Sequence, residues 1–274
     1  MNKYTAKTFS LEVIAILIAL LFLVPFYFVI VNSLKSFSEI LIDAAALPQQ
    51  LLFSNYAQVW EILNFPKAFV NSLIITVFSN IGIVVISSMA AWKMVRTPGK
   101  LSKLLFIFFV AAMVIPFQTV MIPLVKLGGM LGIMNSIPGI IIMYFGFGVP
   151  LSLFLYHGFV KTVPVEVEES ATIDGCSQFG VFWRIVFPLL KPITVTVVIL
   201  NTLWIWNDYL LPLLVLQDAS LRTIPLATSS FFAQYTKQWD MGLAALVMGI
   251  TPIVVFFLFL QKHIIKGIAA GSIK

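Results

Sequence analysis

Charged residues are scarce in this sequence. Only 10% of its 274 residues are Asp, Glu, Lys or Arg, against about 25% in ordinary globular domains, while 60% are hydrophobic. This composition argues against a water-soluble fold and predicts that most of the chain lies in membrane lipid. The net charge of +6 does not indicate nucleic-acid binding, because no basic stripe with interleaved aromatic residues accompanies it.

The residues that build metal and nucleotide sites are scarce as well. The single cysteine, Cys176, excludes an internal disulfide framework, and His157 and His263 lie too far apart for metal-ligand spacing. The one Gly-Lys pair, Gly99-Lys100, lacks the upstream glycine and the following Ser or Thr of a phosphate-binding loop. We therefore expect that the chain itself binds no metal, no ATP and no other cofactor.

Long apolar runs dominate what remains. The first, Leu11–Val31, has about the 20 residues that span a bilayer and is too long for the core of a signal peptide, so we expect a retained first span. Five further runs are close to spanning length: Ala68–Trp92, Leu104–Lys126, Ile137–Phe159, Pro192–Leu211 and Met241–Gln261. The sequence predicts an all-α, polytopic membrane protein with six transmembrane helices in one domain, residues 1–274.

The basic residues of the loops predict the orientation of the chain. Six spans place both termini on one side of the membrane, together with residues 93–103 and 160–191. That side carries 12 of the 17 Lys and Arg residues. Because cytoplasmic loops are enriched in Lys and Arg, we expect both termini in the cytoplasm.

Carboxylates gather in one loop on this cytoplasmic side. The chain has 11 acidic residues, and four of them fall in the loop 161–191 between spans four and five: Glu166, Glu168, Glu169 and Asp174. Pro164 suits the first turn of a helix, whose positive end favours nearby carboxylates by about 0.3–1 kcal/mol each. We therefore predict a short acidic helix after Pro164.

The remainder of the loop predicts a turn and a second helix. Asp174-Gly175 is a typical helix end, and Ser177 is suited to cap an amphipathic helix that continues to Phe187. The spacing alone leaves two interpretations, a loop resting on the membrane and a helix that docks a partner protein. Anionic inner-leaflet lipids repel carboxylates, which counts against the first.

The same residues resemble an element of a known family. The segment Glu169–Gly175, ESATIDG, followed by Ile185, Pro188 and Pro192, is similar to the EAA loop of ABC-importer permeases, with its Glu-Ala-Ala-x-x-x-Gly and Ile-x-x-Pro pattern. The sequence departs from that pattern at Ser170, where the family usually has alanine. Serine is small enough to preserve the packing of the helix.

Two more segments are similar to the carbohydrate-uptake branch of that family, the maltose-type permeases. They are Trp206–Leu213, WNDYLLPL, and the ending from Gln261 to Lys274. The resemblance implies a type I ABC-importer permease fold and a role as a non-catalytic permease subunit for import of a sugar or oligosaccharide. It also implies residence in the cytoplasmic (inner) membrane of a bacterium or archaeon.

The resemblance further implies partners. They are a cytoplasmic ABC ATPase dimer that uses ATP and Mg, a second and non-identical permease subunit, and an extracytoplasmic sugar-binding protein that contacts the loop Leu213–Asp240. The loop 163–187 would couple the chain to the ATPase, with its acidic side chains meeting basic groups there. The residues assigned to this coupling are Glu168, Glu169, Ser170, Ala171, Asp174, Gly175 and Pro188.

Polar and aromatic side chains within spans are candidates for the substrate path. Amides and carboxylates bind sugar hydroxyls, and tryptophan stacks on sugar rings, although such residues also anchor helices at interfaces or to one another. The candidates are Asn71, Asn80, Gln118, Asn201, Trp204, Asn207 and Asp208.

Other classes of membrane protein remain as alternatives. A permease of the same family for an amino acid, a polyamine or phosphate fits the coupling loop equally well. An ion-coupled secondary transporter usually has several ionisable groups at the membrane midplane and internal repeats, and neither is evident here. An intramembrane protease would need a Ser/His pair, an aspartate pair or zinc ligands, and the spans offer none.

Overall fold

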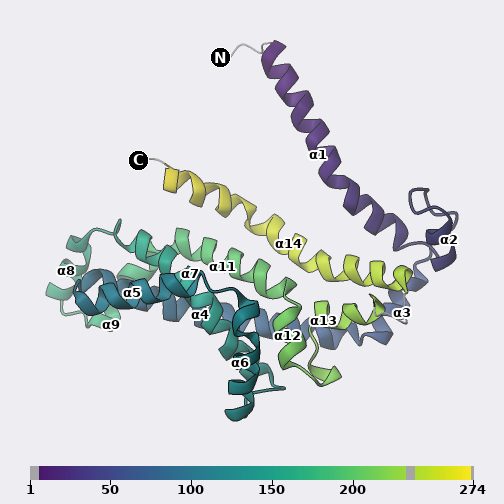
Figure 1. Ribbon diagram of the computed structural model, residues 1–274. Helices are drawn as coiled ribbons and strands as arrows, with labels where there is room; N and C mark the ends of the chain where they lie inside the picture. Colours follow the sequence, from purple (N-terminus) through teal and green to yellow (C-terminus); the bar gives the residue numbers. More distant parts are fainter. Residues whose placement is uncertain (1–5, 233–237, 273–274) are drawn as a thin grey trace. The chain divides into compact units, whose positions relative to one another are not determined.

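The computed structural model describes residues 6–232 and 238–272, and these form helices and turns with no strand among them (Figure 1). This confirms the all-α prediction. The chain divides into two compact units, Met1–Phe65 with Thr228–Pro252, and Pro66–Ala227 with Ile253–Lys274. The single membrane-spanning domain expected from the sequence stays a prediction.

The first unit combines one long apolar helix with short elements. Its elements are α1 (Ala6–Asn32), α2 (Phe37–Ile42), α3 (Ser54–Ile62), the 3-10 segment η3 (Ser229–Phe232) and the first part of α14 (Trp239–Ser272). Val59 of α3 is fully buried in a cluster with Phe231, Ala244 and Ala245. This cluster holds α3 against η3 and the start of α14.

The second unit contains the remaining elements. They are α4 (Phe65–Arg96), α5 (Lys100–Ala112), α6 (Phe117–Met130), α7 (Ile137–Val160), α8 (Val165–Ile173), α9 (Gln178–Val181), the π-helical segment η1 (Phe182–Val186), α10 (Phe187–Leu189), α11 (Lys191–Asn207), α12 (Leu210–Val215), η2 (Ala219–Leu221) and α13 (Ile224–Thr228). Helix α7 packs against both α5 and α11 (Figure 1). Its Tyr144, Leu153 and Tyr156 are fully buried.

Among the described residues, four helices are each long and apolar enough to cross a membrane without interruption. They are Thr8–Asn32, Phe65–Arg96, Ile137–Val160 and Trp239–Phe259. These agree with the first, second, fourth and sixth predicted spans. Two further pairs of bent helices meet the same criterion when each pair is taken together, so the count of six stays a prediction.

The third predicted span, Leu104–Lys126, is wrong as a single helix. The chain bends by 105° between α5 and α6. Pro116 precedes α6 with ψ at 140°, an extended conformation. Proline offers no N–H to the preceding turn and disfavours helix in the residue before it, so the helix ends at Ala112 and restarts at Phe117.

The fifth predicted span, Pro192–Leu211, is too long. Helix α11 ends at Asn207, and Asp208 is extended with ψ at 129°. The Oδ1 atom of Asp208 accepts a hydrogen bond from the backbone N–H of Leu210 at 3.0 Å, as the chain enters α12. A short polar side chain that bonds its own backbone two residues on competes with helix continuation, which explains the earlier end.

Candidate functional site

The acidic segment folds much as its sequence predicts. Pro164 is the N-cap of α8, one position before the expected first turn, and Gly175 has a φ of +85° in the left-handed region. The Oγ atom of Ser177 accepts a hydrogen bond from the backbone N–H of Gly180 at 3.2 Å, which caps α9 as expected. The acidic helix, the glycine turn and the start of the second helix are therefore confirmed.

The second helix of this loop is not a regular α-helix. After Val181 it becomes the π-helical segment η1, in which the N–H of Phe187 donates to the carbonyl of Phe182, five residues earlier. Pro188 has no N–H for the carbonyl of Arg184, which disturbs the α-helical ladder at this point. Sequence periodicity assumes one helical repeat and did not predict the wider turn.

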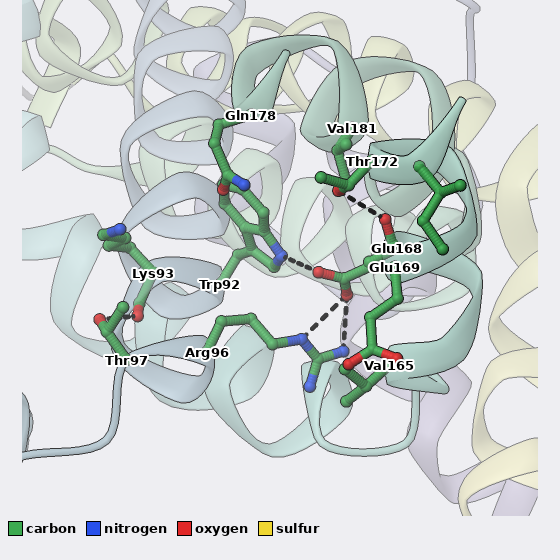
Figure 2. Close-up of a pocket in the computed structure, with 11 residues that line it drawn as sticks. Trp92, Lys93, Arg96, Thr97, Val165, Glu168, Glu169, Thr172, Gln178 and Val181 are labelled. Carbon is green, nitrogen blue, oxygen red and sulfur yellow. Dashed lines mark hydrogen bonds and ion pairs between the residues drawn. The ribbon is translucent and has the colours of Figure 1, made fainter. Parts of the chain in front are cut away.

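Glu168 is buried between α8 and the C-terminal end of α4 (Figure 2). Its Oε1 atom accepts hydrogen bonds from Arg96 Nε at 2.9 Å and Arg96 Nη2 at 2.7 Å. Its Oε2 atom accepts one from Trp92 Nε1 at 2.9 Å. The acidic side chains were expected to meet basic groups on a partner, but both carboxylate oxygens of Glu168 are engaged within this chain.

The opposite side of α8 is exposed. Glu169, Ser170 and Asp174 are exposed, whereas Ala171 is buried against the core. Beside this helix lies an open pocket of about 600 Å³, lined in part by Lys93, Glu169 and Gln178 (Figure 2). With Glu166, which is also exposed, the segment carries three exposed carboxylates, and Glu169 among them lines the pocket. Pro188 lies farther along the loop and is also exposed.

Two of the substrate-path candidates share one cavity. Asn201 and Trp204 of α11 line a space of about 210 Å³ together with Phe147, Gly148 and Leu151 of α7, and Leu200. The Nδ2 atom of Asn201 donates to Ser152 Oγ at 3.0 Å and to the carbonyl of Val197 at 2.9 Å. An amide and an indole thus meet at the contact between α7 and α11.

The other candidates lie apart from that cavity. Asn71 donates to the carbonyls of Ser220 at 2.9 Å and Arg222 at 3.1 Å, and so holds the η2 loop. Asn80 joins α4 to α11 through Thr202 Oγ1 at 3.2 Å. Gln118 is exposed on α6, and Asn207 is exposed and bonded to its own helix.

Asp208 is held by a tyrosine that the sequence did not single out. The Tyr144 hydroxyl donates to Asp208 Oδ2 at 3.0 Å, and the ring of Trp204 meets Tyr144 edge-on at 5.4 Å. With Oδ1 occupied by Leu210, both carboxylate oxygens are engaged. Sequence reasoning also missed Trp92 and Arg96, whose spacing of four residues at the basic end of α4 was the available signal.

In the loop that follows α12, backbone N–H groups donate to the side chains of Asp218 and Asn135. The N–H of Ser220 donates to Asp218 Oδ1 at 2.7 Å, and this bond lowers the pKa of the exposed Asp218 carboxyl. The Oδ1 atom of Asn135 accepts hydrogen bonds from the N–H groups of Gln217 and Asp218. Residues 233–237 of this loop lie outside the described residues.

Comparison with known proteins gives the family. Residues 82–270 match the family described as binding-protein-dependent transport system inner membrane component. The chain is 43% identical to AmyC of Thermoanaerobacterium thermosulfurigenes, a probable starch degradation products transport system permease protein. The match covers the full length of both proteins. This chain belongs to that family. The permease is thus an integral membrane component of a binding-protein-dependent transport system, with a substrate-binding protein as a separate part.

Other relatives agree in length and architecture. The permease is 36% identical to the melibiose/raffinose/stachyose import permease protein MelC of Bacillus subtilis, over 98% of this chain and 99% of the relative. Its fold matches a chain from the crystal structure of a bacterial ABC transporter involved in import of the acidic polysaccharide alginate. The TM-score is 0.81 at 19% identity, covering 96% of this chain and 99% of that chain. The predicted ABC-importer permease fold is confirmed.

Proposed function

We propose that this permease imports a sugar or oligosaccharide, driven by a separate cytoplasmic ATPase that it contacts through residues 163–187. The names of the relatives, which concern starch degradation products and raffinose-type oligosaccharides, support the choice of substrate class. The observation that carries the coupling role is α8, whose inner carboxylate is anchored while its outer face stays exposed. No feature of the described residues favours an amino acid, a polyamine or phosphate instead.

The coupling residues divide by position. Glu169, Ser170 and Asp174 present hydrogen-bonding groups outward and are proposed to meet basic groups of the ATPase. Ala171 and Glu168 face inward and keep the helix seated. Gly175 provides the left-handed turn after α8, and Pro188 lies where the loop returns to the membrane.

The same proposal includes the remaining partners and the orientation. The ATPase is a dimer that binds ATP and Mg, while this chain holds neither and performs no catalysis. A second, non-identical permease completes the membrane part, and the sugar-binding protein delivers substrate from outside. Both termini then face the cytoplasm of the bacterial or archaeal cell.

For the substrate path, the proposal centres on Asn201 and Trp204. They lie in one cavity, and an amide with an aromatic face suits the hydroxyls and ring of a sugar. Asn71, Asn80 and Asp208 hold neighbouring segments in place through the bonds described above. For the exposed Gln118 and Asn207, the path assignment stays a prediction.

The test is a charge reversal on the exposed face of α8. Glu169→Lys should reduce recovery of the ATPase with the tagged permease at least tenfold and abolish sugar uptake in membrane vesicles supplied with the binding protein. Glu61→Lys is the matched control, because Glu61 is also exposed and lies on α3, and the substitution changes the net charge by the same amount. Wild-type recovery and uptake in the Glu169 variant would overturn the docking role. Uptake of an amino acid in place of sugars by the wild type would overturn the substrate class.

A further inference from the structure

The guanidinium of Arg96 joins three segments at the cytoplasmic end of the second unit. Besides its bonds to Glu168 of α8, its Nη2 atom donates to the carbonyls of Val163 at 2.8 Å and Val160 at 3.5 Å. Val160 ends α7, and Val163 lies in the turn before α8. One side chain at the last residue of α4 therefore fixes both the start of α8 and its orientation.

Trp92 provides a second connection from the same helix. Its indole N–H donates to Glu168, and its ring packs against Phe182 of η1 with centroids 5.3 Å apart. Phe182 is itself fully buried. Because Trp92 and Arg96 are one helical turn apart, α4 presents both side chains to α8 together.

The contact between Arg96 and Glu168 is largely shielded from solvent. The side chains of Arg96 and Glu168 are 16% and 9% exposed, so solvent screens their charges little. The two-pronged contact uses the fixed planar fork of arginine, which a lysine cannot reproduce. A buried ion pair of this kind adds little net stability but fixes geometry, and removing one partner leaves an uncompensated charge.

We propose that Arg96, with Trp92, is a positioning residue that makes α8 and α4 move as one body when the ATPase engages α8. This inference rests on the proposed function, since it concerns how force from the ATPase enters the membrane helices. It gives Glu168 a role distinct from that of Glu169: Glu168 fastens α8 to the permease, and Glu169 presents α8 to the partner. We call the contacts of Arg96 and Trp92 with Glu168 the clamp. Loss of the clamp should uncouple ATP hydrolysis from transport.

The functional experiment measures sugar imported per ATP hydrolysed by the complete transporter in proteoliposomes. Arg96→Met and the double variant Arg96→Met/Glu168→Met should each assemble and hydrolyse ATP, with at least a tenfold loss of sugar imported per ATP. Arg96→Lys should fall between these and the wild type. Lys100→Met is the matched control, because Lys100 is an exposed cation at the start of α5 that does not line the pocket beside α8, and it should keep the wild-type ratio.

The double variant separates positioning from mere stability. It removes both buried charges together, so a purely structural role predicts that the import ratio recovers relative to the single variant. Recovery would overturn the inference, and continued loss would support it. An unchanged ratio in Arg96→Met would also overturn it. If the wild-type complex imported no sugar, the proposed function would be overturned, together with the role of Arg96 that rests on it.

A second measurement does not depend on transport. Spin labels at Thr97→Cys and Ile173→Cys, both exposed, in a Cys176→Ser background, report the distance between the end of α4 and α8 in the purified transporter. The distance distribution should be narrow with Arg96 intact and at least twice as broad in Arg96→Met and in the double variant. Equal widths in all of them would show that the clamp does not hold α8, even if sugar import were established.

Discussion

At the scale of single residues, two adjacent glutamates have opposite surroundings. Glu168 is buried with three donors on its carboxylate, while Glu169 is exposed beside a pocket. Successive helical residues point about 100° apart, so neighbours on a half-buried helix meet different environments. The sequence could predict an acidic helix here. It could not predict which glutamate turned inward, because that depends on Trp92 and Arg96, more than 70 residues away.

Gly175 provides a test at this scale. Its φ of +85° is strained for a side chain, although a Cβ atom would meet nothing within 4 Å. Gly175→Val should therefore act through the backbone alone, at a cost of about 1–2 kcal/mol, and misdirect the end of α8. We expect normal amounts in the membrane with sugar uptake reduced at least tenfold.

Gly175→Asn is the matched control for that variant. Asparagine enters the left-handed region more readily than other residues with a side chain, so its uptake should stay within about threefold of wild type. Membrane levels are compared by immunoblot and uptake by filtration of radiolabelled sugar. Equal uptake in the valine and asparagine variants would contradict the importance of this backbone conformation.

At the scale of elements, the sequence predicted helices better than their interruptions. The long runs in α1, α4, α7 and α14 are uniform enough for hydropathy to locate them. The 105° bend before α6 was missed because apolar residues lie on both sides of Pro116. Hydropathy does not depend on the direction in which the chain runs, so the bend leaves no signal in it. The end of α11 was missed because a hydrogen bond of Asp208, and no change in hydropathy, terminates it.

The π-helical segment is the element whose packing is most readily tested. Phe182 is fully buried and contacts Trp92, Trp183 and Phe187 with centroids 5.0 to 5.9 Å apart. Phe182→Ala should destabilise the protein by about 3–5 kcal/mol, because it leaves a cavity among these rings. Phe179→Ala removes the same side chain from a position 64% exposed and should change stability by about 0.5 kcal/mol or less.

Both variants would be compared by thermal unfolding in detergent, monitored by tryptophan fluorescence. A Tm for Phe182→Ala equal to that of Phe179→Ala would contradict the packing described for η1. The comparison isolates burial, since the two positions carry the same residue in the same loop.

At the scale of the whole molecule, the helices by themselves do not determine which side of the membrane each loop occupies. The bias of Lys and Arg predicts that the loop 161–191 is cytoplasmic. The sole cysteine, Cys176, lies in this loop and is partly exposed. A membrane-impermeant maleimide should therefore label the wild-type chain in inside-out vesicles and leave it unlabelled in right-side-out vesicles.

Cys176→Ser provides the background for this measurement and should give no signal in either preparation. Bound ATPase should also slow the labelling of the wild type, if it covers the turn after α8. Labelling from outside in intact, right-side-out vesicles would reverse the predicted topology and place α8 beyond the reach of any cytoplasmic partner.

The bend between α5 and α6 has a consequence for biogenesis. At 1.5 Å per residue, the 13 residues of α5 extend about 20 Å, which is less than the hydrocarbon thickness of about 30 Å. A segment this short does not partition from the translocon as a self-sufficient anchor. Helix α5 packs against α7, which is complete only when Val160 has been synthesised. We therefore expect stable insertion of α5 to be delayed until α7 has been synthesised and can pack against it.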